Sequence, residues 1–109
     1  MDARASVTKI EALWNDLESA PFPWLVGDDA LMFRLTTLDT FAAGCIQTFI
    51  DCNGRLDPER ISVLHGCASD LELCAHDLNG EAKRYFDRLL ALSKLVLASC
   101  LQEESIDVE

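Results

Sequence analysis

Two apolar stripes with the same helical spacing lie on either side of a short turn, and few folds bury both at once. In the first stripe apolar residues recur in steps of 4, 3, 4, 3 and 4, and in the second in steps of 3, 4, 3, 4 and 3. Such steps place side chains on one face of an α-helix. The stripes are Leu31, Leu35, Leu38, Ala42, Cys45 and Phe49, then Ile61, Leu64, Ala68, Leu71, Ala75 and Leu78. They predict two long helices that pack through these faces.

Capping and turn residues mark where these helices begin and end. Asp28 and Asp29 begin the first, because carboxylates are favourable at a helix N-terminus. Gly54 ends it, since glycine accepts a positive φ. Asp57 and Pro58 then supply a cap and a first helical residue. Asn79-Gly80 separates a last helix, whose apolar face is Ala82, Phe86, Leu89, Val96 and Cys100.

A shorter helix is predicted near the N-terminus. Thr8-Lys9-Ile10-Glu11 fits a capping box, and an apolar face of Ile10, Leu13, Trp14 and Leu17 follows. Pro21 and Pro23 predict an extended link, from which Phe22 and Trp24 pack onto the core.

These elements predict an all-α fold, an antiparallel helical bundle of three long helices plus a short N-terminal helix. We expect a single domain over residues 1–101 and a flexible acidic tail over residues 102–109.

Charge is unevenly distributed along the chain. Asp and Glu number 19 and Lys and Arg 9, for a net charge of −10. Residues 10–54 and 57–78 are acidic, whereas residues 83–94 carry a basic stripe of Lys83, Arg84, Arg88 and Lys94. Nucleic-acid binding requires a basic surface, so we expect no nucleic-acid partner. An acidic surface instead favours a basic protein partner.

The sequence shows no apolar run of about 18 residues and no signal peptide, so we expect a cytoplasmic protein without a membrane partner. The five cysteines are odd in number and form no Cys-x-x-Cys motif. We expect them to be free thiols that pack as small apolar side chains.

No residue pattern predicts catalysis, a cofactor or a metal ion. Glu72 and His76 share a helix face, which supplies only half of a metal site. Neither His65 with Cys67 nor His76 with Cys74 faces its neighbour, since each pair is two residues apart. We therefore expect a protein that is not an enzyme.

The outer face of the two striped helices is the candidate partner surface. A turn that pivots near Arg55 places Gly44 and Gly66 at one level, where two small residues leave a shallow dip. Mid-helix glycine costs about 1 kcal/mol relative to alanine, which invites a functional reason, although a tolerated cost or tight helix packing also explains it. The candidate partner-binding residues are Asp39, Gly44, Asp51, Glu59, Gly66, Asp70 and Asp77.

Several segments resemble those of small, uncharacterised bacterial helical proteins. They are Ala43-Gly44-Cys45, Leu56-Asp57-Pro58-Glu59-Arg60, Asn79-Gly80-Glu81-Ala82 and Tyr85-Phe86, within residues 40–92. In size and acidity the chain is also similar to bacterial immunity proteins. That resemblance implies a protein that neutralises a toxin by binding it.

Two other interpretations stay open. The apolar faces are wider than a surface helix needs, so they line the interface of a homo-oligomeric adaptor or are covered by the N-terminal helix and link.

Leu64-His65-Gly66 resembles the start of the histidine phosphotransfer motif. The chain departs from that motif at Cys67 and Ala68, and we place His65 beside the apolar face rather than on the exposed one. Solubility alone also explains the charge.

Overall fold

The computed structural model describes residues 3–25 and 27–107, with side chains described for residues 6–25 and 27–101. Four helices make up this part of the chain: α1 (Ala3–Ser19), α2 (Asp29–Asp51), α3 (Pro58–Ala75) and α4 (Gly80–Asp107). The described residues contain no strand, and the prediction of an all-α fold is confirmed.

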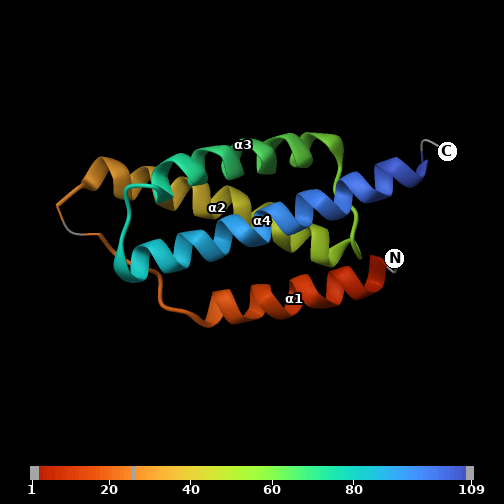
Figure 1. The fold of residues 1–109 in the computed structure, drawn as a ribbon, viewed down its shortest axis with the longest axis horizontal. Coiled ribbons are helices and arrows are strands. Elements are labelled where there is room, and N and C mark those ends of the chain that lie inside the picture. The colour runs from red at the N-terminus through yellow and green to blue at the C-terminus, as the bar shows by residue number, and fades with distance from the viewer. Residues whose placement is uncertain (1–2, 26, 108–109) are drawn as a thin grey trace.

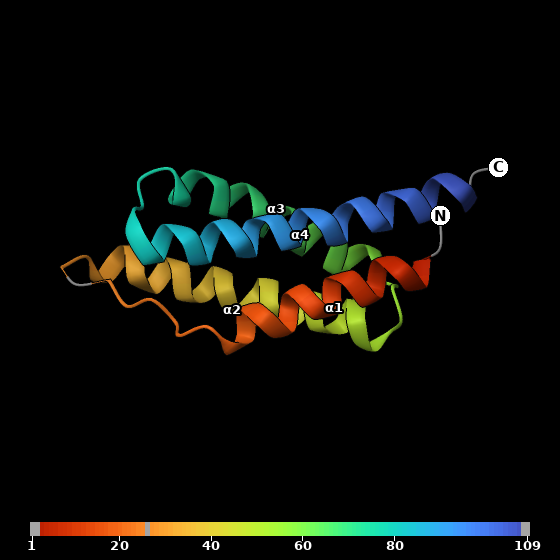
Figure 2. The ribbon, with the colours of Figure 1, turned by 60° about the horizontal axis from the view of Figure 1, so that its bottom comes forward.

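The helices lie side by side, and each runs opposite to the one before it (Figure 1). α3 packs against α2 and α4, while α1 packs against α4 and α2. The second view shows α1 beside α4 although the two are far apart in the sequence (Figure 2). The molecule is elongated, about 51 × 24 × 19 Å.

The predicted apolar faces form the core. Leu35, Leu64, Leu71, Phe86 and Leu89 are completely buried. All the described positions of the two stripes are buried except Leu31 and Ile61, which are partly buried against the core. Four of the five cysteines are buried and Cys52 is exposed, and none of the five is in a disulfide.

The first helix is longer than predicted. α1 begins at Ala3, and at 17 residues it nearly matches the 18 of α3, so the predicted short helix capped at Thr8 is wrong. Residues before Thr8 join the helix because Val7 is buried against the start of the α2–α3 turn. Leu13, assigned to the apolar face, is instead exposed.

The predicted caps of α2 and α3 are in place. The carboxylate of Asp28 accepts a hydrogen bond from the amide of Leu31 at 3.0 Å, and that of Asp57 accepts one from Arg60 at 3.2 Å. Asn53, with a φ of +57°, takes the left-handed position that ends α2, and Gly54 follows it with a φ of +95°.

The link between α1 and α2 packs through one of its two aromatic residues. The ring of Phe22 lies edge-on to Tyr85 and Phe86, at 5.4 and 5.8 Å between centroids. Trp24 contacts Phe22 but remains 74% exposed, so the prediction that it packs onto the core is wrong. Its place outside the core leaves a large apolar ring facing solvent.

The last helix continues through Asp107, beyond the predicted end of the compact domain at residue 101. The side chains of residues 102–107 lie outside the described set. The flexibility of the acidic tail stays a prediction.

Candidate functional site

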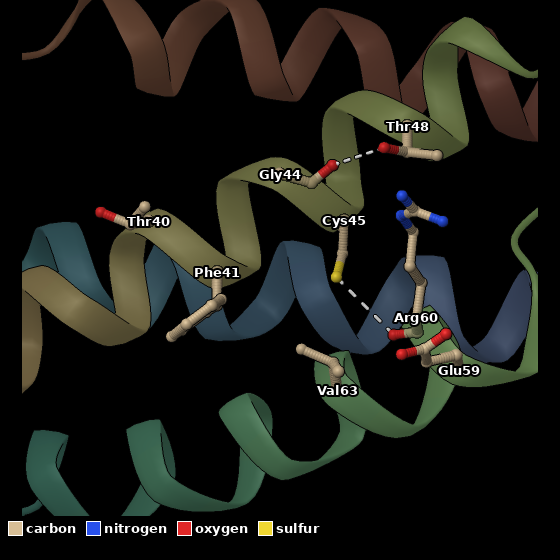
Figure 3. A pocket seen from close by; sticks show the side chains of 8 residues that line it. All are labelled: Thr40, Phe41, Gly44, Cys45, Thr48, Glu59, Arg60 and Val63. Atoms are coloured by element: carbon tan, nitrogen blue, oxygen red, sulfur yellow. Dashed lines mark hydrogen bonds between the residues drawn. The ribbon is translucent and has the colours of Figure 1, made fainter.

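A hollow of about 360 Å³ opens between α2 and α3 on their outer side (Figure 3). We call it the α2–α3 hollow. It is lined by Thr40, Phe41, Gly44, Cys45, Thr48, Glu59, Arg60 and Val63. Two of the seven predicted partner-binding residues, Gly44 and Glu59, are among these.

Small and apolar residues create this space. Gly44 has no side chain, and a Cβ atom built on it would meet nothing within 4 Å. Phe41 and Val63 extend from the two helices on the same side of the hollow (Figure 3), and they are 55% and 40% exposed. Exposed apolar side chains beside an open space are typical of a surface that binds another molecule.

The thiol of Cys45 lies at the base of the hollow. It donates a hydrogen bond to the carbonyl oxygen of Arg60 at 3.6 Å, which joins α2 to α3. Burial raises the pKa of this thiol, and likewise that of Cys67. Because the thiolate is the reactive form, both cysteines are suited to packing rather than to nucleophilic chemistry.

The charged residues of the hollow differ in how they are paired. A guanidinium nitrogen of Arg60 lies 2.8 Å from a carboxylate oxygen of Asp57, and this bond holds the pKa of Asp57 below its usual range. Glu59 makes no hydrogen bond or ion pair with another described residue, although its charge reaches Arg60. The carboxylate of Glu59 is therefore available to an incoming cation.

A second apolar pair lies further along the same face. Phe33 on α2 and Leu73 on α3 are 76% and 69% exposed. Between them and the hollow, Arg34 and Asp70 approach to 3.9 Å. The outer face thus carries two exposed apolar pairs along its length.

Gly44 and Gly66 do not lie at one level, contrary to the prediction. In two antiparallel helices, the numbers of residues at the same level have a constant sum. The contacts Cys45–Arg60 and Arg34–Asp70 give sums of 105 and 104, so Gly44 lies level with residues 60–61 of α3. Gly66 is therefore displaced by about 8 Å, at about 1.5 Å per helical residue. The connection is asymmetric because its tight turn comes first, at residues 52–54, and the non-helical residues 55–57 follow.

Asp39 lies on another side of α2, facing α4. Its carboxylate accepts a hydrogen bond from the hydroxyl of Tyr85 at 2.9 Å. Burial raises the pKa of Asp39, and the bond from Tyr85 opposes this rise. The structure therefore does not bring Asp39 together with the other candidate residues.

The remaining candidate carboxylates keep mostly to the outer surface. Asp51 accepts a hydrogen bond from Gln47 at 3.0 Å, and Gln47 in turn accepts one from Trp14 of α1. Asp70 pairs loosely with Arg34, and Asp77 is exposed beyond the end of α3. Their role in partner binding stays a prediction.

The basic stripe of α4 is largely neutralised within the molecule. Arg88 contacts Asp16 of α1 at 2.9 Å, and Lys94 contacts Glu72 of α3 at 3.1 Å. Lys83 contacts Asp87 of the same helix at 3.3 Å. None of the candidate carboxylates is used in these pairs.

Among the described side chains, neither histidine belongs to a cluster of residues that could bind a metal ion. His65 is exposed, so its predicted place off the exposed face is wrong, and the departures at Cys67 and Ala68 remain as the argument against phosphotransfer. Within residues 6–25 and 27–101, no three side chains of metal-ligand type come together. No helix in the described part of the chain is long and apolar enough to cross a membrane.

A second, smaller hollow of about 190 Å³ lies where the link meets α4. It is lined by Ala20, Pro21, Glu81, Arg84, Tyr85 and Arg88. Two of its polar side chains are engaged within the protein, Arg88 by Asp16 and Tyr85 by Asp39.

No family model, curated protein or solved structure matches the chain. The functional argument therefore depends on the geometry of the site.

Sequence reasoning missed the apolar part of this surface. Phe33, Phe41 and Val63 are not among the candidate partner-binding residues that the sequence predicts. One signal was present: Phe33 and Phe41 are eight residues apart, about 80° around α2, and neither belongs to the apolar stripe.

Proposed function

We propose that this chain is an antiparallel helical bundle that acts as an acidic, non-enzymatic binding module for a basic protein, through the outer face of α2 and α3. The observation that carries the proposal is the α2–α3 hollow, where exposed Phe41 and Val63 lie beside Glu59, whose carboxylate pairs with no other described side chain. Apolar contacts supply affinity at such a surface, and carboxylates select and steer a cationic partner.

The specific form of this function is the neutralisation of a basic toxin by an immunity protein in the cytoplasm. A nuclease toxin needs a basic groove to hold phosphates. An acidic protein is steered to such a groove and occludes it. The net charge of −10 and the small size of the chain agree with this role.

The proposal is tested by affinity capture with the immobilised protein from a lysate of its native source. Captured proteins are identified by mass spectrometry, and the Kd of each is measured by calorimetry. We expect a basic protein that binds the wild type and loses at least tenfold in affinity on Glu59→Lys with Asp77→Lys.

Glu11→Lys with Glu18→Lys is the matched control, because both residues are exposed on α1. We expect this variant to bind like the wild type. Equal weakening by both charge reversals would show that total charge, not the α2–α3 face, governs binding, and the proposal would be wrong.

The alternative is a homo-oligomeric adaptor that associates through the same face. The exposed side chains of Phe33 and Leu73 favour it, since monomers seldom leave large apolar groups together in solvent. Light scattering distinguishes the two: a dimer that Phe33→Ser dissociates supports the adaptor.

A further inference from the structure

We propose that the outer face of α2 and α3 binds one amphipathic, cationic α-helix of the partner, lying along the two helices. This inference rests on the proposed function and specifies the shape and chemistry of what is bound. It follows from the spacing of the exposed apolar pairs, the small residues between them and the position of the free carboxylate.

The two apolar pairs are spaced for a helix. Phe33 and Phe41 are eight residues apart on α2, and Leu73 and Val63 are ten residues apart on α3. At about 1.5 Å per residue the pairs lie about 12–15 Å apart along the face. A helix laid along it would contact both pairs with apolar residues about two turns apart, at positions i and i+7 or i+8.

Beside the Arg34–Asp70 contact, small residues between the pairs let a helix approach closely. Gly66 and Ser69 on α3 and Thr37 and Thr40 on α2 occupy this interval on the outer side. A Cβ atom on Gly66 would meet nothing within 4 Å, so the backbone is open to a neighbour there. Close approach of a partner helix explains why glycine, which lowers helix propensity, is found at the exposed Gly44 and Gly66.

Charge selects a cationic helix over a second copy of this chain. Within the described part of the chain Glu59 pairs with no side chain beside the hollow, and Asp77 is exposed at the opposite end of α3. The cations of this face are already engaged, Arg60 by Asp57 and Arg34 by Asp70. Lys or Arg residues flanking the apolar positions of the partner helix would meet carboxylates at both ends.

The inference is tested with a synthetic 18-residue helical peptide that has Leu at i, i+4, i+7 and i+8 and Lys on either side of them. Its binding to the full-length protein is followed by shifts of the backbone amide signals in NMR. We expect saturable shifts confined to α2 and α3, centred on Phe41, Gly44 and Val63. A peptide of the same composition in scrambled order should bind at least tenfold more weakly.

Variants at residues of similar exposure distinguish specific binding at the hollow from nonspecific binding to exposed apolar side chains. We expect Phe41→Ala to raise the Kd about tenfold and Leu13→Ala, which truncates an exposed leucine of α1, to leave it unchanged. Gly44→Leu should abolish binding by filling the hollow, with thermal unfolding confirming that the variant folds. Glu59→Gln should raise the Kd about threefold, and Glu11→Gln should not.

Three results would overturn the inference: no shifts at millimolar peptide, equal binding of the scrambled peptide, or shifts on α1 and α4. If they occurred while Glu59→Lys with Asp77→Lys still released a captured basic protein, the proposed function would stand and the helical binding mode would fall. If that charge reversal had no effect either, both would fall.

Discussion

At the scale of single residues, the hydrogen bond from Tyr85 to Asp39 is the clearest polar tie between α4 and α2. We expect Tyr85→Phe to lower the free energy of unfolding by about 1–2 kcal/mol at neutral pH, because it leaves a half-buried carboxylate without its donor. Urea denaturation measures this loss.

The same loss should shrink as the pH falls. Burial raises the pKa of Asp39, and without Tyr85 that pKa rises further, since the hydroxyl opposes the effect of burial. A carboxyl whose pKa is higher in the folded than in the unfolded state gains stability on protonation, so the variant recovers as the pH falls through this range. In an Asp39→Asn background, Tyr85→Phe should cost the same at neutral pH and at about pH 5. A pH-dependent cost there would point to another group.

Residue patterns predicted burial well where spacing alone decides it, and poorly where a side chain lies at the edge of a helix face. Leu35 and Leu71, in the middle of their stripes, are completely buried. Phe41 is beside its stripe, and which way it turns depends on how closely α3 approaches. Only the packed structure decides that, so the apolar half of the site could not be read from the sequence.

At the scale of elements, the α2–α3 turn is held against the start of α1 through Gly54. A Cβ atom on Gly54 would lie 2.9 Å from a methyl carbon of Val7, and φ there is +95°. We expect Gly54→Ala to cost more stability than Gly27→Ala, which has a φ of +98° but nothing within 4 Å. Left-handed strain alone costs about 1–2 kcal/mol, and displacement of Val7 adds about 1–2 kcal/mol at Gly54.

Thermal or urea unfolding of the two variants measures this difference. In a Val7→Ala background the methyl carbon is absent, so the extra cost at Gly54 should disappear and both glycine variants should lose about the same. An extra cost that persisted without Val7 would show that the turn is not braced by α1.

Element boundaries were predictable where a side chain caps the backbone. Asp28 and Asp57 begin α2 and α3 as predicted, because their carboxylates satisfy amides that a helix end leaves free. The start of α1 was not predictable, since Val7 is stabilised by a contact with a turn 47 residues away. The register of α2 on α3 was likewise decided by the shape of the turn rather than by a symmetric pivot.

At the scale of the whole molecule, ion pairs within and between helices cancel much of the positive charge that the sequence concentrates in α4. Three of the four cations of the basic stripe, Lys83, Arg88 and Lys94, contact carboxylates of α4 itself, α1 and α3. Each exposed pair contributes little stability, but together they cancel much of the positive potential of this side. The candidate carboxylates of the α2–α3 face take no part in these pairs, so their charge is not cancelled by α4.

This distribution gives the two functional interpretations opposite responses to salt. Binding of a basic partner joins unlike charges, so raising NaCl from about 50 to 500 mM should weaken it by roughly an order of magnitude. Association of two copies brings together two molecules of charge −10, so the same salt should strengthen it. Calorimetry with the captured partner and light scattering of the isolated chain, both over this salt range, measure the two effects. A dimer that tightens with salt, together with partner binding that salt leaves unchanged, would favour the adaptor over the acidic binding module.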